Sequence, residues 1–325
     1  MTDNPHIMFS ILQVEKWLGL LSDIGRTAAT IKAYRGALHH YLRYCAQQGI
    51  TPHSAHFEDI SAYVRPQLPG MPHSVANATL QLRISAIRLW YDFLTYYDMC
   101  DNNPVLRAMS FSPVYAGRGL IPRIVKIPRI PDDRAWFDLL SLVANAAVRD
   151  RLMLAFAYYG ALRRAEVSAL CIEDLDVGHR LIHIRAETTK NRRERIVCYS
   201  PAIAPVLAAH LTTLRQAGYT GGALFRSASD RNLGQPLTYW TWSKIVRHWA
   251  SQLPLPGLST HTFRHLRLTH LARAGWKLHE LAAYAGHRDP RTTQLYLHLS
   301  GAHLAAKMTG AIAEIDSKIA NIVFH

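Results

Sequence analysis

The spacing of hydrophobic residues predicts that the first part of the chain is helical. Apolar positions recur at helical intervals in four segments, at 7–21, 27–48, 56–64 and 74–97. The last and longest segment has one inward stripe, made of Leu80, Ile84, Ile87, Tyr91 and Leu94. Gly49 directly follows the second segment, as is typical of a helix end. Residues 1–110 therefore indicate an all-helical first domain.

A stretch rich in proline and glycine follows this domain. It contains Pro113, Gly117, Gly119, Pro122, Pro128 and Pro131. Proline and glycine at this density exclude a packed helix, so residues 111–131 are predicted to be a linker. The basic residues between them are Arg118, Arg123, Lys126 and Arg129. Their charge indicates a linker that lies along something anionic.

A second domain, 132–325, begins with helical patterns at 132–147 and 148–159. Two segments of alternating residues, 181–185 and 194–199, enclose a polar stretch and are typical of a β-hairpin. Helical patterns return after Pro201 and continue to Asn321. The fold class predicted for the chain is therefore mainly α, with a small antiparallel β-sheet in the C-terminal domain.

Composition narrows the class of protein. Of 325 residues, 49% are hydrophobic and 18% are charged, so a sizeable core can form. No apolar run approaches the roughly 20 residues that a membrane span needs, and the first residues lack the pattern of a secretory signal. The four cysteines lie far apart, with no Cys-x-x-Cys pair, which argues against a disulfide framework or a thiolate zinc site. We expect a cytoplasmic protein with no membrane partner.

The distribution of charge indicates nucleic acid as a candidate partner. The formal net charge is +14, and residues 135–325 carry 23 Lys and Arg against 13 Asp and Glu. A basic surface favours a polyanion, because each neutralised phosphate releases counterions, although solubility alone also explains such charge. Four basic residues of the first domain lie off the inward stripes and are either DNA contacts or simply solvated: Lys32, Arg35, Arg83 and Arg88.

Four short segments of the second domain carry candidate chemistry: Gly160-Ala-Leu-Arg-Arg-Ala-Glu166, Thr189-Lys-Asn-Arg-Arg-Glu-Arg195, His261-Thr-Phe-Arg-His265 and Gly286-His-Arg-Asp-Pro-Arg-Thr-Thr-Gln-Leu-Tyr296. Each has an ordinary interpretation when taken alone. The spacing of His261 and His265 suits zinc, for example. No Glu stands between them, no third ligand is implied and Arg264 would repel a cation, so we expect no metal here.

Taken together and in order, these segments resemble the catalytic motifs of the tyrosine recombinase (phage integrase, Xer-like) family. That family has Arg in a Gly-x-Leu-Arg-x-x-Glu turn, Lys on a β-hairpin, His-x-x-Arg-His, Gly-His and then Tyr nine residues further on. The matching residues here are Arg163, Lys190, His261, Arg264, His287 and Tyr296. Lys190 is the only lysine between Lys126 and Lys244, and it falls in the hairpin. Ala161 and Phe263 stand where threonine and leucine are commoner.

The resemblance implies a two-domain, C-shaped DNA clamp. Residues 1–110 would form a helical, SAM-like core-binding domain and 132–325 the catalytic domain. Arg163 and Arg264 would bind the non-bridging phosphate oxygens, and Tyr296 would be the nucleophile of a 3′-phosphotyrosyl intermediate. The other roles implied are His261 as base, His287 as a hydrogen-bond partner of the scissile phosphate and Lys190 as general acid.

Further residues are expected to support this chemistry or to bind DNA. Glu166 would hold Arg163, and His265 would brace the site. Arg192, Arg193 and Arg195, beside Lys190, are expected to contact the DNA backbone. The apolar stripe of a helix over 302–323 either packs on its own domain or, as in the resembled family, docks onto a neighbouring protomer.

The resemblance also implies the partners of a bacterial site-specific recombinase. These are double-stranded DNA with an inverted-repeat core site and a homotetramer or heterotetramer on two sites; an accessory DNA-bending or regulatory protein is compatible with this. No cofactor is expected, and the sequence has no phosphate-binding P-loop motif. Integration, excision, cointegrate resolution and replicon-dimer resolution stay open. The competing interpretations are a type IB topoisomerase, which relaxes DNA as a monomer, and a DNA-binding regulator without activity.

Overall fold

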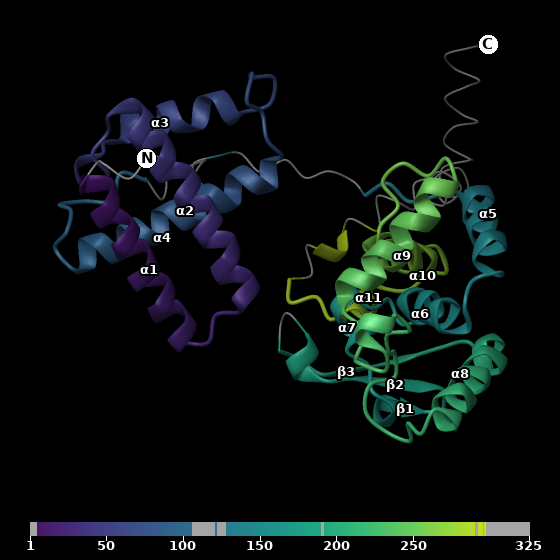
Figure 1. Cartoon of the computed structure of the whole chain (residues 1–325). Coiled ribbons are helices and arrows are strands. Elements are labelled where there is room, and N and C mark those ends of the chain that lie inside the picture. The colour runs from purple at the N-terminus through teal and green to yellow at the C-terminus, as the bar shows by residue number, and fades with distance from the viewer. Residues whose placement is uncertain are drawn as a thin grey trace, which may run out of the picture. The chain divides into compact units, whose positions relative to one another are not determined.

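The computed structural model divides the chain into two compact units, Met1–Lys126 and Ile127–His325 (Figure 1). It describes residues 5–105, 121, 128–189, 192–289, 292–294 and 296. Most of the predicted linker, 111–131, and the predicted tail helix, 302–323, lie outside the described residues.

The first unit is made of helices, as the sequence predicts. Its elements are α1 (Pro5–Asp23), α2 (Ala28–Gln48), η1 (Pro52–Ser54), α3 (Phe57–Val64), η2 (Arg65–Gln67) and α4 (Asn77–Tyr96). The Thr27 side chain accepts a hydrogen bond from the backbone N–H of Thr30, which caps the start of α2. Gly49 ends α2 with φ of 67°, a left-handed conformation that glycine adopts without strain.

The core of the first unit lies between α1, α2, α3 and α4. All five residues of the stripe predicted for α4 are buried. A buried polar pair crosses this core: the Tyr41 and Tyr91 hydroxyls lie 2.8 Å apart, and Tyr91 donates to the carbonyl of Pro52 at 2.7 Å. Because both hydroxyls are paired, burying them avoids the cost of an unsatisfied polar group.

The second unit combines helices with a small sheet. Its helices are α5 (Asp133–Val143), α6 (Val148–Tyr159), α7 (Arg164–Ser168), α8 (Ala204–Gln216), α9 (Tyr239–Gln252), α10 (Thr260–Arg273) and α11 (Leu278–Ala285). Its strands are β1 (Leu175–Asp176), β2 (Leu181–Ile184) and β3 (Arg195–Cys198), in the antiparallel order β1-β2-β3. The short 3₁₀ helices are η4 (Ile172–Asp174), η5 (Ala186–Thr188), η6 (Pro201–Ile203) and η7 (Asp230–Asn232).

The predicted hairpin is present, with Leu181 opposite Cys198 and Ile184 opposite Arg195. Two other expectations were wrong in detail. The helix expected over 132–147 ends at Val143, and the helical pattern expected after Pro201 is interrupted over 217–238. Positive φ angles at Gly218, Gly222 and Gly234 mark this interruption, because a helix cannot continue through them.

The core of the second unit forms around α6, which packs against α8 and α10. Large aromatic side chains from different elements meet there: Trp136, Phe156, Trp242 and Phe263. This packing fixes α10, whose other face carries candidate site residues. Within the described part of the chain, no helix has both the length and the apolar character needed to cross a membrane.

Candidate active site

Helix α10 brings three candidate residues to one face. His261, Arg264 and His265 are spaced i, i+3 and i+4, so their side chains lie on the same side of the helix. The helix begins where the backbone N–H of Ser259 donates to the Thr262 hydroxyl at 3.0 Å. Phe263 and Leu266 point into the core and anchor the opposite side.

Arg264 is almost completely buried, with 3% of its surface exposed. Its guanidinium donates to two backbone carbonyls, that of Ala161 at 2.6 Å and that of Ala285 at 2.5 Å. Ala161 has φ of 48° in the tight turn after α6. Burial, and then the charge of Arg163, lower the pKa of Arg264 to about 9. Arg264 therefore stays protonated at neutral pH.

Arg163 lies at the start of α7 and forms an ion pair with Glu166. The two groups are 2.8 Å apart, and the Glu166 carboxylate also accepts from the backbone N–H of Arg163 at 2.9 Å. Arg195 donates to both oxygens of the same carboxylate, at 2.6 and 3.2 Å. Burial alone would raise the pKa of Glu166, but hydrogen bonds and charges from Arg195, and then from Arg163, lower it to about 2.

The three arginines also meet the end of α11. Arg195 donates to the carbonyl of Tyr284 at 3.1 Å, Arg264 to that of Ala285 and Arg163 to that of Gly286 at 3.2 Å. The last carbonyls of a helix have no partner within the helix and carry partial negative charge. Three consecutive carbonyls therefore offset part of the repulsion between the three guanidinium groups.

Gly286 turns the chain from α11 toward His287. Its φ of 63° is left-handed, and the His287 N–H closes the turn on the Ala282 carbonyl at 3.0 Å. A Cβ at Gly286 would lie 3.2 Å from Arg195, so glycine also allows this close approach. His287 Nδ1 lies 2.9 Å from the Thr293 hydroxyl. Burial, then the charges of Arg264 and Arg163, lower the pKa of His287 to about 3.

Tyr296 is buried beside these groups, with 2% of its surface exposed. Its hydroxyl lies 2.9 Å from His265 Nδ1, and its ring is parallel to that of His287, with centroids 6.2 Å apart. Burial raises the pKa of Tyr296, although the charges of Arg264 and Arg163 act in the opposite direction. Tyr296 is therefore a neutral phenol in the free chain.

The two α10 histidines differ in exposure and in contacts. His265 is half-buried and bonds Tyr296, and burial followed by the nearby His261 lowers the pKa of His265 to about 4. His261 is exposed, and its ring centroid lies 6.1 Å from that of His265. Desolvation by its surroundings, then the charges of Arg264, Arg163 and Arg164, lower the pKa of His261.

The structure thus brings five of the six predicted catalytic residues into one region, while Lys190 lies outside the described residues. The sequence interpretation missed how Arg195 is held. Its side chain is 7% exposed and bonds Glu166, so it lies among the candidate residues and not on an open surface. Its expected contact with the DNA backbone stays a prediction. Strand alternation is the signal that could have identified this placement, because Arg195 shares the inward face of β3 with buried Val197. Thr293, the partner of His287, was also missed.

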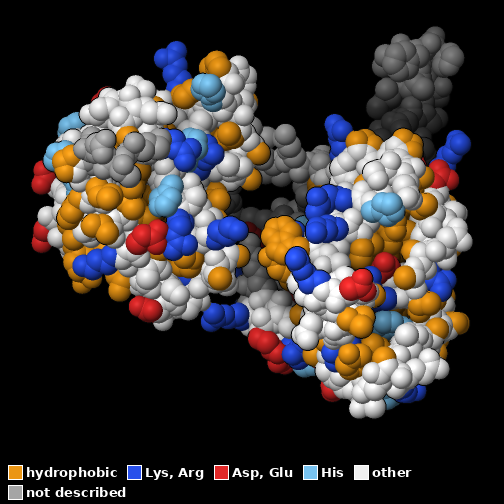
Figure 2. Space-filling model, viewed as in Figure 1, with side chains coloured by type: hydrophobic (Ala, Val, Ile, Leu, Met, Phe, Trp, Pro, Cys, Tyr) orange, Lys and Arg blue, Asp and Glu red, His pale blue; other side chains and the backbone are white. Residues whose placement is uncertain are grey.

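The predicted DNA contacts have varied surroundings. Lys and Arg side chains are visible on both units in Figure 2. Arg35 forms a two-fold contact with Glu15, at 2.8 Å for both bonds, and Arg83 donates to Gln67 at 2.5 Å. The remaining candidates of this kind are exposed or half-buried: Lys32, Arg88, Arg192 and Arg193. Their role in binding DNA stays a prediction.

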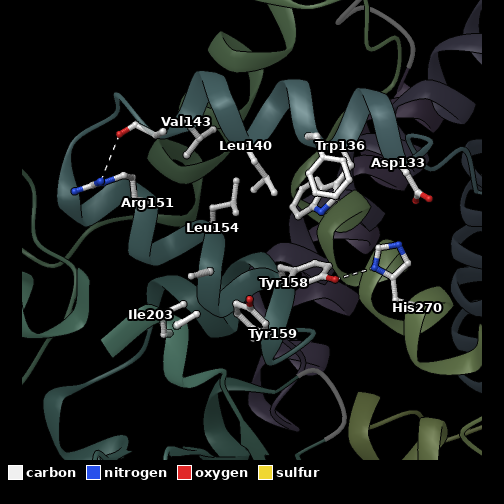
Figure 3. A pocket seen from close by; sticks show the side chains of 14 residues that line it. Asp133, Trp136, Leu140, Val143, Arg151, Leu154, Tyr158, Tyr159, Ile203 and His270 are labelled. Atoms are coloured by element: carbon white, nitrogen blue, oxygen red, sulfur yellow. Dashed lines mark hydrogen bonds between the residues drawn. The ribbon is translucent and has the colours of Figure 1, made fainter. Parts of the chain in front are cut away.

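A pocket of about 660 Å³ lies beside α10, away from this cluster (Figure 3). Trp136 and Phe137 of α5, and Tyr158 of α6, contribute to its lining, and His270 of α10 closes one side. The Tyr158 hydroxyl lies 2.8 Å from His270 Nδ1, a contact that ties α6 to α10. None of the predicted catalytic residues lines this pocket, so we place the candidate site in the cationic cluster.

Comparison with known proteins points to one family. A sequence model of the phage integrase family matches residues 136–303, and one of the phage integrase N-terminal SAM-like domain matches 14–96. The tyrosine recombinase XerC of Roseiflexus castenholzii is 26% identical over 296 residues, which are 89% of each chain. XerC of Pelotomaculum thermopropionicum is 29% identical over 290 residues, 85% of this chain and 89% of that one.

Solved structures show the same fold. The XerH site-specific recombinase bound to a palindromic difH substrate, in a post-cleavage complex, aligns with a TM-score of 0.68 at 16% identity, covering 94% of this chain and 89% of that one. The Tn1549 transposon integrase in complex with a circular intermediate DNA aligns with a TM-score of 0.63 at 16% identity, covering 88% and 94%. The chain therefore belongs to the phage integrase family and is a tyrosine recombinase, an enzyme of site-specific recombination that transfers DNA strands.

Proposed function

We propose that this enzyme cuts and rejoins two DNA duplexes at an inverted-repeat core site through a 3′-phosphotyrosyl intermediate. The Tyr296 oxygen attacks the scissile phosphorus, the bond to the 5′ oxygen breaks, and that oxygen leaves as a hydroxyl. A 5′-hydroxyl of the partner duplex then attacks the phosphotyrosyl bond and releases Tyr296. Because each step exchanges one phosphate ester for another, strand transfer needs no outside energy source.

The excess of positive charge beside Tyr296 is the observation that carries this proposal. Arg163, Arg195 and Arg264 bring three positive charges together, and among the described residues Glu166 is the one carboxylate paired with them. This excess of positive charge favours the binding of an anion. A phosphate in the pentavalent transition state carries more charge on its non-bridging oxygens than in the ground state, so preorganised guanidinium donors favour the transition state.

The proton of Tyr296 needs an acceptor, because the phenol is neutral in the free chain. We propose that the two α10 histidines divide this task. His265 holds the hydroxyl while Tyr296 is buried. When Tyr296 turns to reach DNA it meets His261, the exposed member of the pair, which takes the proton. Lys190 is proposed to protonate the departing 5′ oxygen.

A suicide substrate, nicked close to the cleavage site, tests the proposal. The wild type should become covalently linked to the 3′ end, because the released fragment diffuses away and rejoining is blocked. Tyr296→Phe should bind the same DNA without forming the adduct. An adduct with the phenylalanine variant would show that another residue is the nucleophile. Relaxation of supercoiled plasmid without recombination would instead indicate a topoisomerase.

We further propose that four protomers assemble on two DNA sites, joined by the apolar stripe over 302–323. This stripe contains Leu304, Met308, Ile312, Ile315, Ile319 and Ile322. Deleting residues 302–325 should leave the binding of one site intact and abolish the pairing of two sites, measured by gel shift with one and two labelled duplexes. Unchanged pairing would mean that the stripe packs on its own domain.

The biological role is proposed to be either movement of a mobile element or resolution of replicon dimers. Both roles stay open, because the chain is similar both to tyrosine recombinases named XerC and to a transposon integrase. Mapping the strand-exchange point in DNA from the source cell separates them, because an element boundary indicates integration or excision and a chromosomal or plasmid locus indicates dimer resolution. Adding purified protein to naked DNA tests whether an accessory protein is required.

A further inference from the structure

Arg164, the residue after the catalytic arginine, is held by aromatic rings of α9. Its guanidinium carbon lies 4.8 Å from the ring centroid of Tyr239 and 5.2 Å from that of Trp240. Both distances are within the range of an attractive cation–π contact. Its Nη1 also lies 3.5 Å from the Ser243 hydroxyl, a long hydrogen bond at best. We call Tyr239 and Trp240 the aromatic shelf.

Among the described residues, the charge of Arg164 is not balanced by a carboxylate. Within the described part of the chain, no Asp or Glu forms a salt bridge with it, whereas Arg163 and Arg195 both pair with Glu166. The aromatic shelf orders the guanidinium without neutralising it, since a ring face offers no formal negative charge. An ordered cation with free donors is suited to bind an anion.

The position of Arg164 places this cation beside the catalytic cluster. It directly follows Arg163 in the chain, and α7 packs against α9, which carries the shelf. The charge of Arg164 is among those that lower the pKa of His261, together with Arg264 and Arg163. Trp240 is 56% exposed, an unusual state for so large an apolar ring.

We propose that Arg164 binds a DNA backbone phosphate next to the scissile one, and that the exposed face of Trp240 packs on the deoxyribose of the same nucleotide. The inference rests on the proposed function and adds a second phosphate subsite to it. Arg163 and Arg264 would bind the phosphate that reacts, whereas Arg164 would fix the neighbouring phosphate and so the position of the strand. Phosphate contacts of this kind set register rather than sequence preference.

Interference by neutral phosphates tests the subsite. A set of core-site duplexes, each with one methylphosphonate in place of a phosphate near the cleavage point, is titrated with wild type and with Arg164→Ala. On unmodified DNA, Arg164→Ala should bind about tenfold more weakly, since a hydrogen bond to a charged group contributes that order of affinity. The slope of log affinity against log salt should fall by about one.

The decisive result is position-specific. Wild type should lose affinity at one phosphate adjacent to the scissile one, and Arg164→Ala should be indifferent at that phosphate while remaining sensitive at the others. A role that merely stabilises the fold would weaken binding everywhere and leave the pattern unchanged. Equal sensitivity of the two proteins at every phosphate overturns the inference.

Two further variants complete the design. Trp240→Ala, which removes part of the aromatic shelf, should reduce the wild-type effect at the same phosphate, and Trp240→Phe should retain it; no change with Trp240→Ala would overturn the role of the shelf. Arg215→Ala removes an exposed arginine of α8 as the matched control.

A separate assay measures whether wild type forms the covalent adduct, so that failure of the proposed function can be told apart from failure of the Arg164 subsite. A missing adduct refutes the proposed function, whereas a normal adduct with an unchanged interference pattern refutes only the Arg164 subsite.

Discussion

Neutralising Glu166 should cost the second unit a large part of its stability. The two arginines that bond this carboxylate lower its pKa from the ordinary 4.5 to about 2. Each pKa unit corresponds to about 1.4 kcal/mol, so ionised Glu166 stabilises the folded state by about 3 kcal/mol at neutral pH. Glu166→Gln, which keeps the size of the side chain, should lower the free energy of unfolding by about that amount. Removing one partner from a buried ion pair has a cost of this order.

The effect should depend on pH in a defined direction. A lowered pKa means that the stabilisation is complete above pH 4.5, the value of the unfolded chain, and is lost as pH falls toward about 2. The loss of unfolding free energy caused by Glu166→Gln should therefore shrink at pH 3 to about half of its value at pH 7. This loss is called the deficit below. Urea unfolding at pH 7 and pH 3 measures both values, with Glu187→Gln, an exposed carboxylate paired with Arg185, as control. A deficit below about 1 kcal/mol at pH 7, or one that does not shrink at pH 3, would refute the reasoning.

Three further outcomes follow from the site. Histidine NMR of the free chain should show the His265 ring neutral down to about pH 4; a ring already charged at pH 6 would contradict its burial against Tyr296. In cleavage assays, His261→Ala should slow adduct formation about 100-fold, and His265→Ala less than tenfold; the reverse order would move the role of base to His265. Gly286→Ala should destabilise the second unit by about 1–2 kcal/mol in thermal unfolding, because it strains a left-handed φ and crowds Arg195; an unchanged melting temperature would show that the turn adapts.

The elements that could be predicted from the sequence are those with local signals. The stripe on α4 repeats at helical intervals, and all five of its residues are buried, because the same periodicity that reveals a helix also creates its inward face. The β2–β3 hairpin was visible from alternation. Strand β1 has only two residues, too few for any periodicity, and it exists because β2 pairs with it. The break over 217–238 depends on backbone angles at glycines, which the hydrophobic pattern does not encode.

Some features of the candidate site could likewise be predicted from the sequence, and others could not. The motifs of the resembled family pointed to Arg163, Arg264 and Tyr296, and the structure places these residues close together. Their roles in the reaction stay predictions. Strand alternation places Arg195 on the inward face of β3, but the neighbouring residues do not say which groups it contacts there. Its partners, Glu166 and the Tyr284 carbonyl, are 29 and 89 residues away in the chain. Contacts over such separations are set by tertiary packing.

The end of α11 explains how so much like charge can be held together before DNA arrives. Guanidinium groups repel one another, and a single carboxylate balances only part of that repulsion. The carbonyls of Tyr284, Ala285 and Gly286 offset a further part, because they lie at the negative end of α11 and each accepts a hydrogen bond from one arginine. Carbonyls orient the donors without cancelling their charge, unlike further carboxylates. The arginines are thus fixed in place and still positive, which is the condition for stabilising a phosphate whose charge grows during the reaction.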